Sequence, residues 1–240
     1  MKINTLIPAL AIAGVLASAP VGAADLTVYT YESFISSWGP GPELKKRFEA
    51  ECVCSIDFVG AEDGVALLNR LKLEGARTGA DVVVGLDDSL MADARAAGVV
   101  KPHRVDLAAV PLSPALQWSD DSFVPFDHGY FAFIYDSRKI AAPARSFAEL
   151  VDGKAKIIYQ DPRTSTPGLG LAHWVRAVFK DEAPAAWRKL AANTVTVTSG
   201  WQEAYTLFLN GEADYVLSYT TSPAYHVVAE GVDHYRAAAF

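Results

Sequence analysis

Apolar and polar positions in the first half of the chain follow a strand–helix rhythm. Residues 26–31 alternate and are β-prone, and residues 80–85 form the unbroken apolar run typical of a buried parallel strand. The predicted elements are strands at 26–31, 54–59 and 80–85, a loop at 32–42, and helices at 43–50, 63–73 and 89–97. This alternation predicts a parallel sheet covered by helices, with ligand sites beyond the carboxyl ends of the strands.

The second half repeats the rhythm after an apolar crossing. Residues 123–127 and 129–136 are predicted to form a strand pair that runs from one core into the next. The elements that follow are predicted as a helix at 146–151, a strand at 156–159, a helix from Leu169, a helix at 183–192, a strand at 194–197, a helix at 201–210 and a strand at 215–219. We therefore expect an α/β protein with one lobe at 25–127 and a second at 128–240, built on mostly parallel sheets.

The N-terminus has the pattern of a secretory signal. Lys2 precedes a short uncharged apolar run at 6–16, and small residues precede Asp25. We predict a cleavable signal peptide at 1–24, with an uncleaved anchor as the alternative. No later segment reaches the length of a membrane span.

Composition narrows the choice of partners. The 240 residues carry 21 Lys and Arg against 28 Asp and Glu, a net charge of −7, with no basic run. Nucleic acid is therefore not expected as a partner, and a cationic ligand is mildly favoured. Cys52 and Cys54 are read as a small buried or redox-labile pair in preference to a disulfide, because a bridge over one residue makes a strained ring.

Enzyme signatures are mostly absent. The chain contains no G-x-S-x-G elbow, no Walker loop and no His-Glu-x-x-His, and its five histidines lack metal-ligand spacing. Gly168 and Gly170 are not followed by the third glycine of a dinucleotide fingerprint, since His173 stands there. We expect no enzyme, no cofactor and no metal.

The segment 161–170 (Asp-Pro-Arg-Thr-Ser-Thr-Pro-Gly-Leu-Gly) is the strongest functional signal. It joins a predicted strand to a predicted helix and is rich in hydroxyl groups and glycine. Because a helix start carries unpaired N–H groups and partial positive charge, this loop is expected to seat an anionic or strongly accepting group.

Two further signals lie in predicted strand-end loops. Five aromatic residues occur beside Gly, Ser, Thr or Pro: Tyr31, Trp38, Trp201, Tyr219 and Tyr225. Each alone reads as core, but together they favour a stacking pocket for an aromatic or quaternary cation. Asp63 reads first as a helix N-cap and second as a carboxylate that faces the cleft.

These segments together resemble a known family. The motifs are 26–31, Trp-Gly-Pro-Gly-Pro at 38–42, Glu-Asp-Gly at 62–64, 159–170, and Leu-Ser-Tyr-Thr-Thr-Ser-Pro-Ala-Tyr-His at 217–226. The likeness, from about Leu26 to Phe240, is to the periplasmic thiamine-binding proteins, the solute receptors of bacterial thiamine ABC importers. It implies a type II periplasmic binding fold whose two lobes close over thiamine, thiamine monophosphate or thiamine diphosphate in a cleft between them. It also implies a periplasmic, monomeric receptor that delivers its ligand to a membrane permease.

The resemblance carries roles for individual residues. Asp63 and Gly64 would contact the aminopyrimidine end of the ligand, and Ser165 and Thr166 the phosphate or hydroxyethyl end. The remaining site residues are those expected to line the cleft, Trp201, Tyr219, Thr220, Thr221 and Ser222, and those expected as walls around the thiazolium, Tyr31, Trp38 and Tyr225.

The sequence departs from the family at one point, and several alternative functions remain. Family members continue beyond Phe240, so we expect the first lobe to lack its C-terminal return strand, closing helices and a further aromatic contact, which exposes edges and apolar surface. A polyamine, a phosphonate or iron(III) is an alternative ligand, although iron is disfavoured because six positions and Pro223 separate Tyr219 from Tyr225. A thiamine-modifying enzyme is the other rival; it would need a cysteine in the cleft, and Cys52 and Cys54 lie beside the start of the second predicted strand, away from its carboxyl end.

Overall fold

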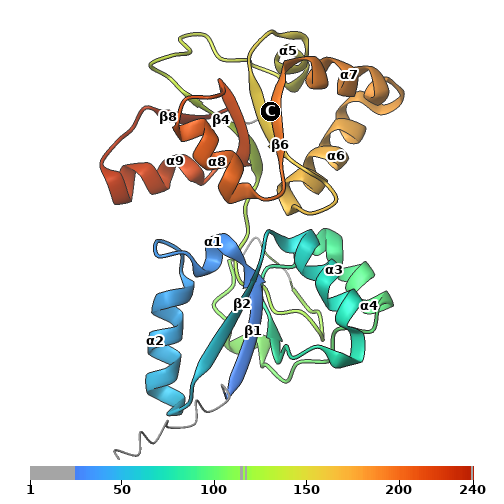
Figure 1. Ribbon diagram of the computed structural model, residues 1–240, viewed down its shortest axis with the longest axis vertical. Helices are drawn as coiled ribbons and strands as arrows, with labels where there is room; N and C mark the ends of the chain where they lie inside the picture. Colours follow the sequence, from blue (N-terminus) through green and yellow to red (C-terminus); the bar gives the residue numbers. More distant parts are fainter. Residues whose placement is uncertain (1–24, 114–115, 117, 239) are drawn as a thin grey trace, which may run out of the picture.

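The chain folds into two α/β lobes stacked end to end (Figure 1). The computed structural model describes residues 25–113, 116, 118–238 and 240. The signal peptide predicted at 1–24 lies outside these residues. Within the described ranges, no helix is long and apolar enough to cross a bilayer.

The first lobe is built on a parallel three-stranded sheet in the order β2-β1-β3. Its strands are β1 (Leu26–Tyr31), β2 (Ile56–Ala61) and β3 (Val82–Val83). β1 pairs with β2 from Leu26 opposite Ile56 to Tyr31 opposite Ala61. The loops that leave β1 and β2 therefore start side by side at one edge of the sheet.

Helices flank this sheet. They are α1 (Glu32–Ile35), α2 (Gly41–Cys52), α3 (Gly64–Glu74) and α4 (Met91–Ala96), with 3-10 turns at Gly75–Arg77, Asp88–Leu90 and Leu107–Ala109. The core beneath α3 is formed by Leu67, Leu68 and Leu71, each at most 1% exposed. Their spacing places them on one helix face, as the apolar periodicity predicts.

Four predictions for the first lobe are wrong in detail. The strand expected at 54–59 is Ile56–Ala61. Residues 32–42 are not all loop, because α1 follows β1 directly. α2 begins at Gly41 rather than at 43, because Pro42 fits a first helical turn, where its missing N–H is not needed. The strand expected at 80–85 pairs only at Val82–Val83, and Gly85 leaves extended geometry with φ 111.

The second lobe contains a five-stranded sheet in the order β6-β5-β7-β4-β8. Its strands are β4 (Phe131–Asp136), β5 (Ile157–Gln160), β6 (Thr194–Thr198), β7 (Tyr215–Tyr219) and β8 (Tyr235–Ala238). β5 is parallel to β6 and β7, whereas β4 is antiparallel to both β7 and β8. Because β4 is reversed, two of the four pairings are antiparallel, and this sheet is mixed.

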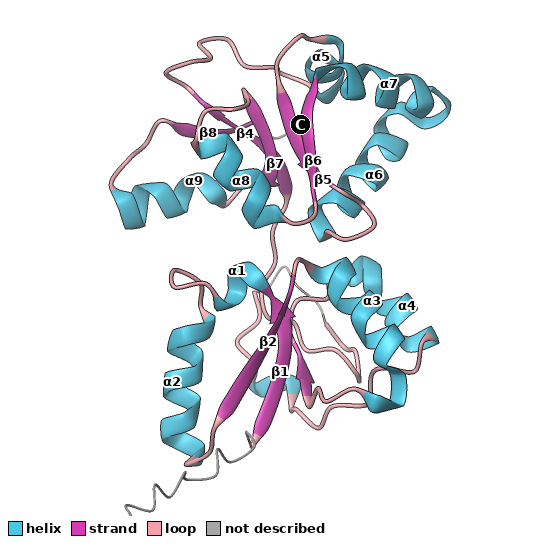
Figure 2. Cartoon of the chain, in the orientation of Figure 1, coloured by secondary structure: helices cyan, strands magenta, loops and turns pink. Residues whose placement is uncertain are grey.

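Helices cover both faces of this sheet (Figure 2). They are α5 (Phe147–Asp152), α6 (Thr166–Phe179), α7 (Ala183–Asn193), α8 (Trp201–Leu209) and α9 (Ser222–Tyr225), with a 3-10 turn at Lys180–Glu182 and a π-helical turn at His226–Glu230. Successive side chains of β4 point to opposite faces of the sheet, and each face has its own apolar core. Phe133 packs with α5, α6 and α7, while Ala132 and Ile134 pack on the other face with Tyr205 and Phe208 of α8.

The second lobe differs from the predicted elements in four places. Of the strand pair expected at 123–127 and 129–136, only Phe131–Asp136 forms a strand. Residues 123–130 do not, and Pro125 among them has no N–H to donate to a neighbouring strand. α6 begins at Thr166, not Leu169, with Pro167 in its first turn. β8 and the helical stretch from Ser222 to Glu230 were not predicted.

The two cysteines form a disulfide. Cys52 at the end of α2 is bonded to Cys54 across Val53, which adopts a left-handed conformation with φ 55 and is 91% exposed. The preference for a small buried or redox-labile pair over a disulfide is therefore wrong: the cysteines are bonded, and Cys52 is exposed. The tight turn that closes the helix at Val53 brings the two sulfur atoms together.

We predict that Asp136 stabilises the second lobe in a pH-dependent way. Arg138 donates to it through its backbone N–H and its guanidinium, and this holds the pKa of Asp136 at about 2, below the ordinary value of about 4. A lowered pKa stabilises the folded state above pH 4, and the contribution disappears as the pH falls to about 2. Asp136→Asn should cost about 1–2 kcal/mol at pH 7, allowing for solvent around Arg138, and almost nothing at pH 2, measured by urea unfolding.

Asp152→Asn is the matched control. Asp152 pairs with Lys189 in solvent, so its loss should change the free energy of unfolding by at most about 0.5 kcal/mol at either pH. An Asp136→Asn deficit of equal size at pH 7 and pH 2 would contradict the assignment.

Candidate ligand-binding site between the lobes

Asp63 stands at the start of α3 and points toward the second lobe. Its backbone is extended, and its Oδ1 accepts a hydrogen bond from the Gly64 N–H at 2.7 Å. Its Oδ2 accepts a hydrogen bond from the Ser165 hydroxyl at 2.6 Å. The N-cap interpretation of Asp63 is confirmed, and the same carboxylate also bridges the lobes.

Ser165 belongs to the loop singled out in the sequence. It occupies the N-cap position of α6 and is fully buried, but its hydroxyl makes no bond to its own helix. A serine in this position ordinarily caps the helix that it precedes. Here its donor is used on Asp63 instead, and the Thr166 N–H at the start of α6 faces the same carboxylate.

Three helix starts converge on the Asp63 carboxylate. Gly64, Thr166 and Trp201 are the first residues of α3, α6 and α8, and their N–H groups all face it. Burial raises the pKa of Asp63, and these N–H groups and the Ser165 hydroxyl oppose the rise. Helix starts attract negative charge, so the arrangement is an anion seat that an aspartate of the chain itself occupies in this structure.

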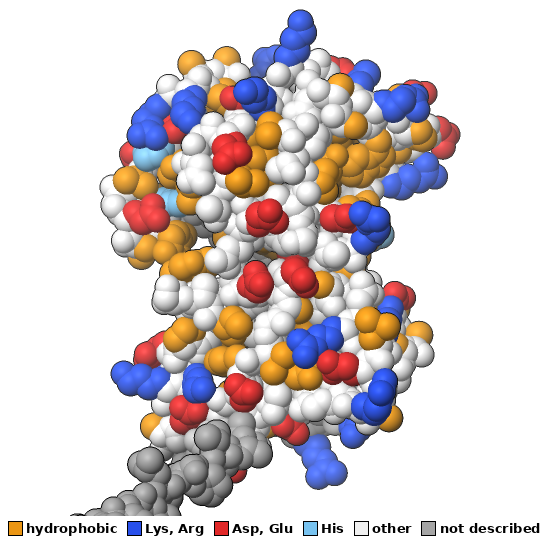
Figure 3. Space-filling view, viewed as in Figure 1, with side chains coloured by type: hydrophobic (Ala, Val, Ile, Leu, Met, Phe, Trp, Pro, Cys, Tyr) orange, Lys and Arg blue, Asp and Glu red, His pale blue; other side chains and the backbone are white. Residues whose placement is uncertain are grey.

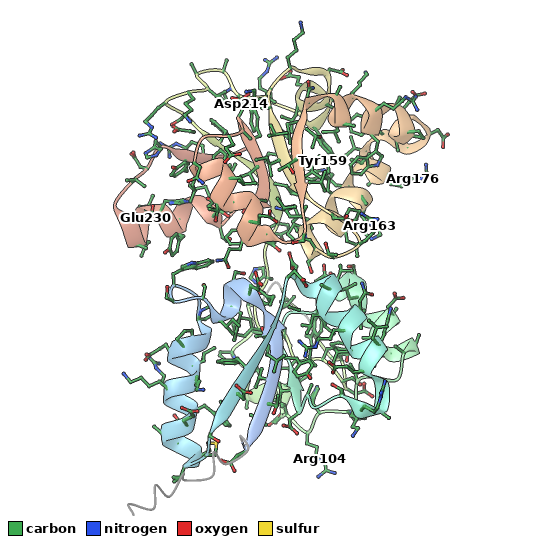
Figure 4. The ribbon with its side chains drawn as sticks, viewed as in Figure 1. Arg104, Tyr159, Arg163, Arg176, Asp214 and Glu230 are labelled. Atoms are coloured by element: carbon green, nitrogen blue, oxygen red, sulfur yellow. A yellow bond between two sulfur atoms is a disulfide. The ribbon has the colours of Figure 1, made fainter. Side chains whose placement is uncertain are left out.

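The loop before α6 rests on α3 through further contacts. The Ala66 N–H donates to the Thr164 carbonyl at 2.8 Å, and the Asn69 amide donates to the Arg163 carbonyl at 3.2 Å. Leu169 packs against the apolar cluster of the first lobe. Figure 4 shows Arg163 at the end of the second lobe that faces the first. The lobes are therefore closed on each other at this edge.

Glycine permits this close approach at two positions. A Cβ at Gly64 would lie 2.4 Å from Thr166 Oγ1 and 2.5 Å from the Gly85 carbonyl oxygen. A Cβ at Gly200 would lie 2.6 Å from the Glu62 carbonyl oxygen. Any larger residue at either position would push the lobes apart.

An aromatic group lies across the same interface. Trp38, in the loop between α1 and α2, has its ring centroid 6.0 Å from that of Trp201 and 6.0 Å from that of Tyr225. Trp38 and Tyr225 are 46% and 43% exposed. Three aromatic residues from both lobes thus form one wall that a ligand can reach.

Tyr31 and Tyr219 are buried beside several carboxylates. Burial raises the pKa of Tyr31 to about 12, helped by the charges of Asp127 and Asp63. Burial also raises the pKa of Tyr219 well above its usual value, and Asp63, Asp87 and Asp127 add to the rise. The phenols therefore stay neutral, and the carboxylates make this region favourable for a cation.

Asp87 and Asp127 were missed by the sequence analysis. Burial raises the pKa of Asp87, and desolvation raises that of Asp127 against the opposing charge of His128. Figure 3 shows acidic side chains on both sides of the waist between the lobes. Asp87 lies in a strand-end loop that the sequence already marked as a ligand edge, so that signal was available. For Asp127, the only signal in the sequence was its position in the segment that connects the two lobes.

Residues 220–222, which follow β7, differ in their contacts. The Thr220 N–H donates to the Tyr130 carbonyl at 2.9 Å, and the Ser222 hydroxyl oxygen lies 2.7 Å from that of Ser218. Thr221 is exposed. Neither threonine hydroxyl takes part in the bonds around Asp63 or in the aromatic group.

The structure brings most of the predicted residues together but alters one relation. Asp63 and Ser165 were assigned to opposite ends of a ligand, yet they are in direct contact here, so no ligand can lie between them in this closed state. Within the described residues, no group of three or more His, Cys, Asp or Glu is arranged to hold a metal ion.

Comparisons with known proteins agree with this geometry. Residues 40–236 match the family model described as bacterial extracellular solute-binding protein. The chain is 58% identical over 217 residues to a thiamine-binding periplasmic protein of Salmonella typhimurium LT2, covering 90% of this chain and 66% of the relative. It is 56% identical over 228 residues to the protein of that name from Escherichia coli K12, covering 94% and 69%. The chain thus spans about two thirds of the relatives that it matches.

Solved structures give the same result. A periplasmic thiamin binding protein superposes with a TM-score of 0.85 at 57% identity, covering 90% of this chain and 68% of that one. Iron-bound HitA from Pseudomonas aeruginosa superposes with a TM-score of 0.68 at 20% identity, covering 88% and 68%, which shows the shared fold alone. The expected type II binding-protein fold is confirmed. The chain belongs to the bacterial extracellular solute-binding proteins and, among them, to the family of thiamine-binding periplasmic proteins.

Proposed function

We propose that this chain captures thiamine and its mono- and diphosphate between its two lobes in the periplasm and delivers them to the membrane permease of an ABC importer. It acts as a monomer, without catalysis, cofactor or metal. The family supports the ligand class, since relatives more than half identical are named for thiamine binding.

The observation that carries the proposal is the paired chemistry at the lobe interface. One part is the anion seat, where Ser165 and the starts of α3, α6 and α8 face Asp63. The other is the aromatic wall of Trp38, Trp201 and Tyr225. Thiamine phosphates combine an aromatic cation with an anionic tail, which matches both parts.

Different residues bind the cationic and the anionic parts of the ligand. The thiazolium cation is stabilised by the faces of the aromatic wall and by the carboxylates around Tyr31 and Tyr219, a cation–π contact contributing about 0.5–2 kcal/mol. A phosphate uses the N–H groups at the helix starts, and to do so it displaces the Asp63 carboxylate.

Two of the rivals, a thiamine-modifying enzyme and an iron(III) receptor, lack support from the described contacts. A thiamine-modifying enzyme needs a thiol in the cleft, but Cys52 and Cys54 are bonded to each other before β2, at the opposite end from Asp63. Iron ligation needs two convergent phenols. Tyr219 packs on Phe131, at 5.3 Å between ring centroids, whereas Tyr225 packs on Trp38.

The first prediction from the proposed function concerns ligand class. Isothermal calorimetry should show binding of thiamine and both phosphates with a Kd at or below about 1 μM, equivalent to about −8 kcal/mol. Spermidine and ferric citrate should give no heat of binding, because they cannot use the aromatic wall and the anion seat together. Binding of either one in preference to thiamine would refute the proposed function.

The second prediction concerns the aromatic wall. Trp38→Ala should weaken thiamine binding about tenfold or more, because it removes the first lobe's share of the wall. Phe48→Ala is the matched control: Phe48 lies on α2 of the same lobe and is also 46% exposed. Calorimetry should show native affinity for the Phe48 variant. Equal losses in the two variants would remove Trp38 from the site.

The third prediction concerns ligand charge. Asp63→Asn removes a negative charge from the anion seat, so the affinity ratio of thiamine diphosphate to thiamine should rise about tenfold. Asp57→Asn, an exposed aspartate on β2 of the same lobe, should leave the ratio unchanged. If Asp63→Asn weakens all three ligands by one common factor, Asp63 does not compete with the phosphate.

A further inference from the structure

A run of hydrogen bonds begins at the aromatic wall and leads into the second lobe. The Trp201 indole Nε1–H donates to the Ser218 hydroxyl at 2.7 Å. The Ser218 and Ser222 hydroxyl oxygens are 2.7 Å apart, and Ser218 is fully buried. Trp201 is therefore held by its polar edge as well as by its neighbours.

The run continues to the outer surface. The Tyr205 hydroxyl faces Ser222 and lies 2.8 Å from His226 Nε2. His226 Nδ1 lies 2.6 Å from Glu230 Oε2. His226 is 1% exposed, whereas the Glu230 side chain is 45% exposed. Figure 4 shows Glu230 on the far side of the second lobe from α6, in the segment that follows α9.

The chemistry of the groups limits the directions of these bonds. An indole nitrogen can only donate, so Ser218 accepts from Trp201. The three hydroxyls can each donate and accept, and each His226 ring nitrogen faces an oxygen atom, of Tyr205 or of Glu230. A buried polar group without a partner is costly, so the run is stable only while its members stay together.

Ring stacking reinforces the same geometry. The Tyr205 ring is stacked on Trp201, at 4.9 Å between centroids and 21° between planes, and on His226 at 5.7 Å and 15°. The run joins α8 to β7 and to the π-helical turn that His226 begins, directly after Tyr225. Two members of the aromatic wall are thus tied to one buried network. π-helical turns occur often at functional sites.

We propose that Tyr205 and His226 are positioning residues of the ligand site. Through Ser218 and Ser222 they hold the Trp201 indole, and through the π-helical turn they hold Tyr225, in the orientation that an aromatic cation requires. Neither side chain contacts the ligand. Pre-ordering these rings lowers the cost of binding. The proposal rests on the proposed function, whose ligand it serves.

The test compares two pairs of matched variants. Tyr205→Phe keeps the ring and removes the hydroxyl, and its control is Tyr215→Phe, which loses a buried hydroxyl bonded to the Ala144 N–H in the same lobe. Glu230→Gln removes the acceptor charge at a solvent-accessible position, and its control is Glu149→Gln, whose side chain is also 45% exposed.

The expected results separate positioning from stability. Calorimetry should show thiamine affinity about tenfold weaker in Tyr205→Phe and about threefold weaker in Glu230→Gln. Both controls should stay within about twofold of the native chain, although Tyr215→Phe loses comparable stability in urea. In 19F NMR of fluorotryptophan-labelled protein without ligand, the Trp201 resonance, assigned by its loss in Trp201→Phe, should shift or broaden in Tyr205→Phe and Glu230→Gln only.

The outcomes distinguish the two proposals. Equal affinity losses in Tyr205→Phe and Tyr215→Phe with an unmoved Trp201 resonance would overturn the positioning role. If the native chain binds no thiamine, the proposed function fails, and the Trp201 resonance alone tests the positioning role. A shifted or broadened resonance in Tyr205→Phe and Glu230→Gln then supports that role, and an unchanged resonance overturns it.

Discussion

The contact between the two lobes depends on one buried carboxylate, that of Asp63, which needs hydrogen-bond donors. A charged Asp63 removed from water is costly unless charge-assisted bonds replace its hydration. Its own helix supplies one of them, from Gly64. The others come from Ser165 and the starts of α6 and α8, all in the second lobe. Satisfying this group therefore requires the lobes to approach, and Gly64 and Gly200 leave room for it.

The closed approach has consequences away from Asp63. It brings Trp38 against Trp201 and Tyr225, although these residues lie in three separate segments. It also concentrates the negative charge of Asp87 and Asp127 around Tyr31 and Tyr219. The same interface therefore joins donors for an anion, faces for an aromatic ring and charge for a cation, which suits a ligand carrying all three properties.

Local pattern predicted most of the architecture and less of the site. The main strands and long helices were found because their apolar periods survive in any environment. α1, β8 and the helical stretch from Ser222 to Glu230 were missed, because such short segments show no clear apolar period and depend on tertiary partners. The segment 161–170 was correctly read as a helix start, but its partner in this state, an aspartate about 100 residues earlier, was not.

By itself, the sequence determined the elements, the order of the two lobes and the family, because these depend on residue period and on motifs of adjacent positions. Only the tertiary structure decided which groups meet. It placed Asp63 on Ser165 and linked Trp201 to Glu230 through buried side chains. Hydrogen bonds and burial depend on distance in space, and nothing in the local pattern records which distant segments the fold brings to the same place.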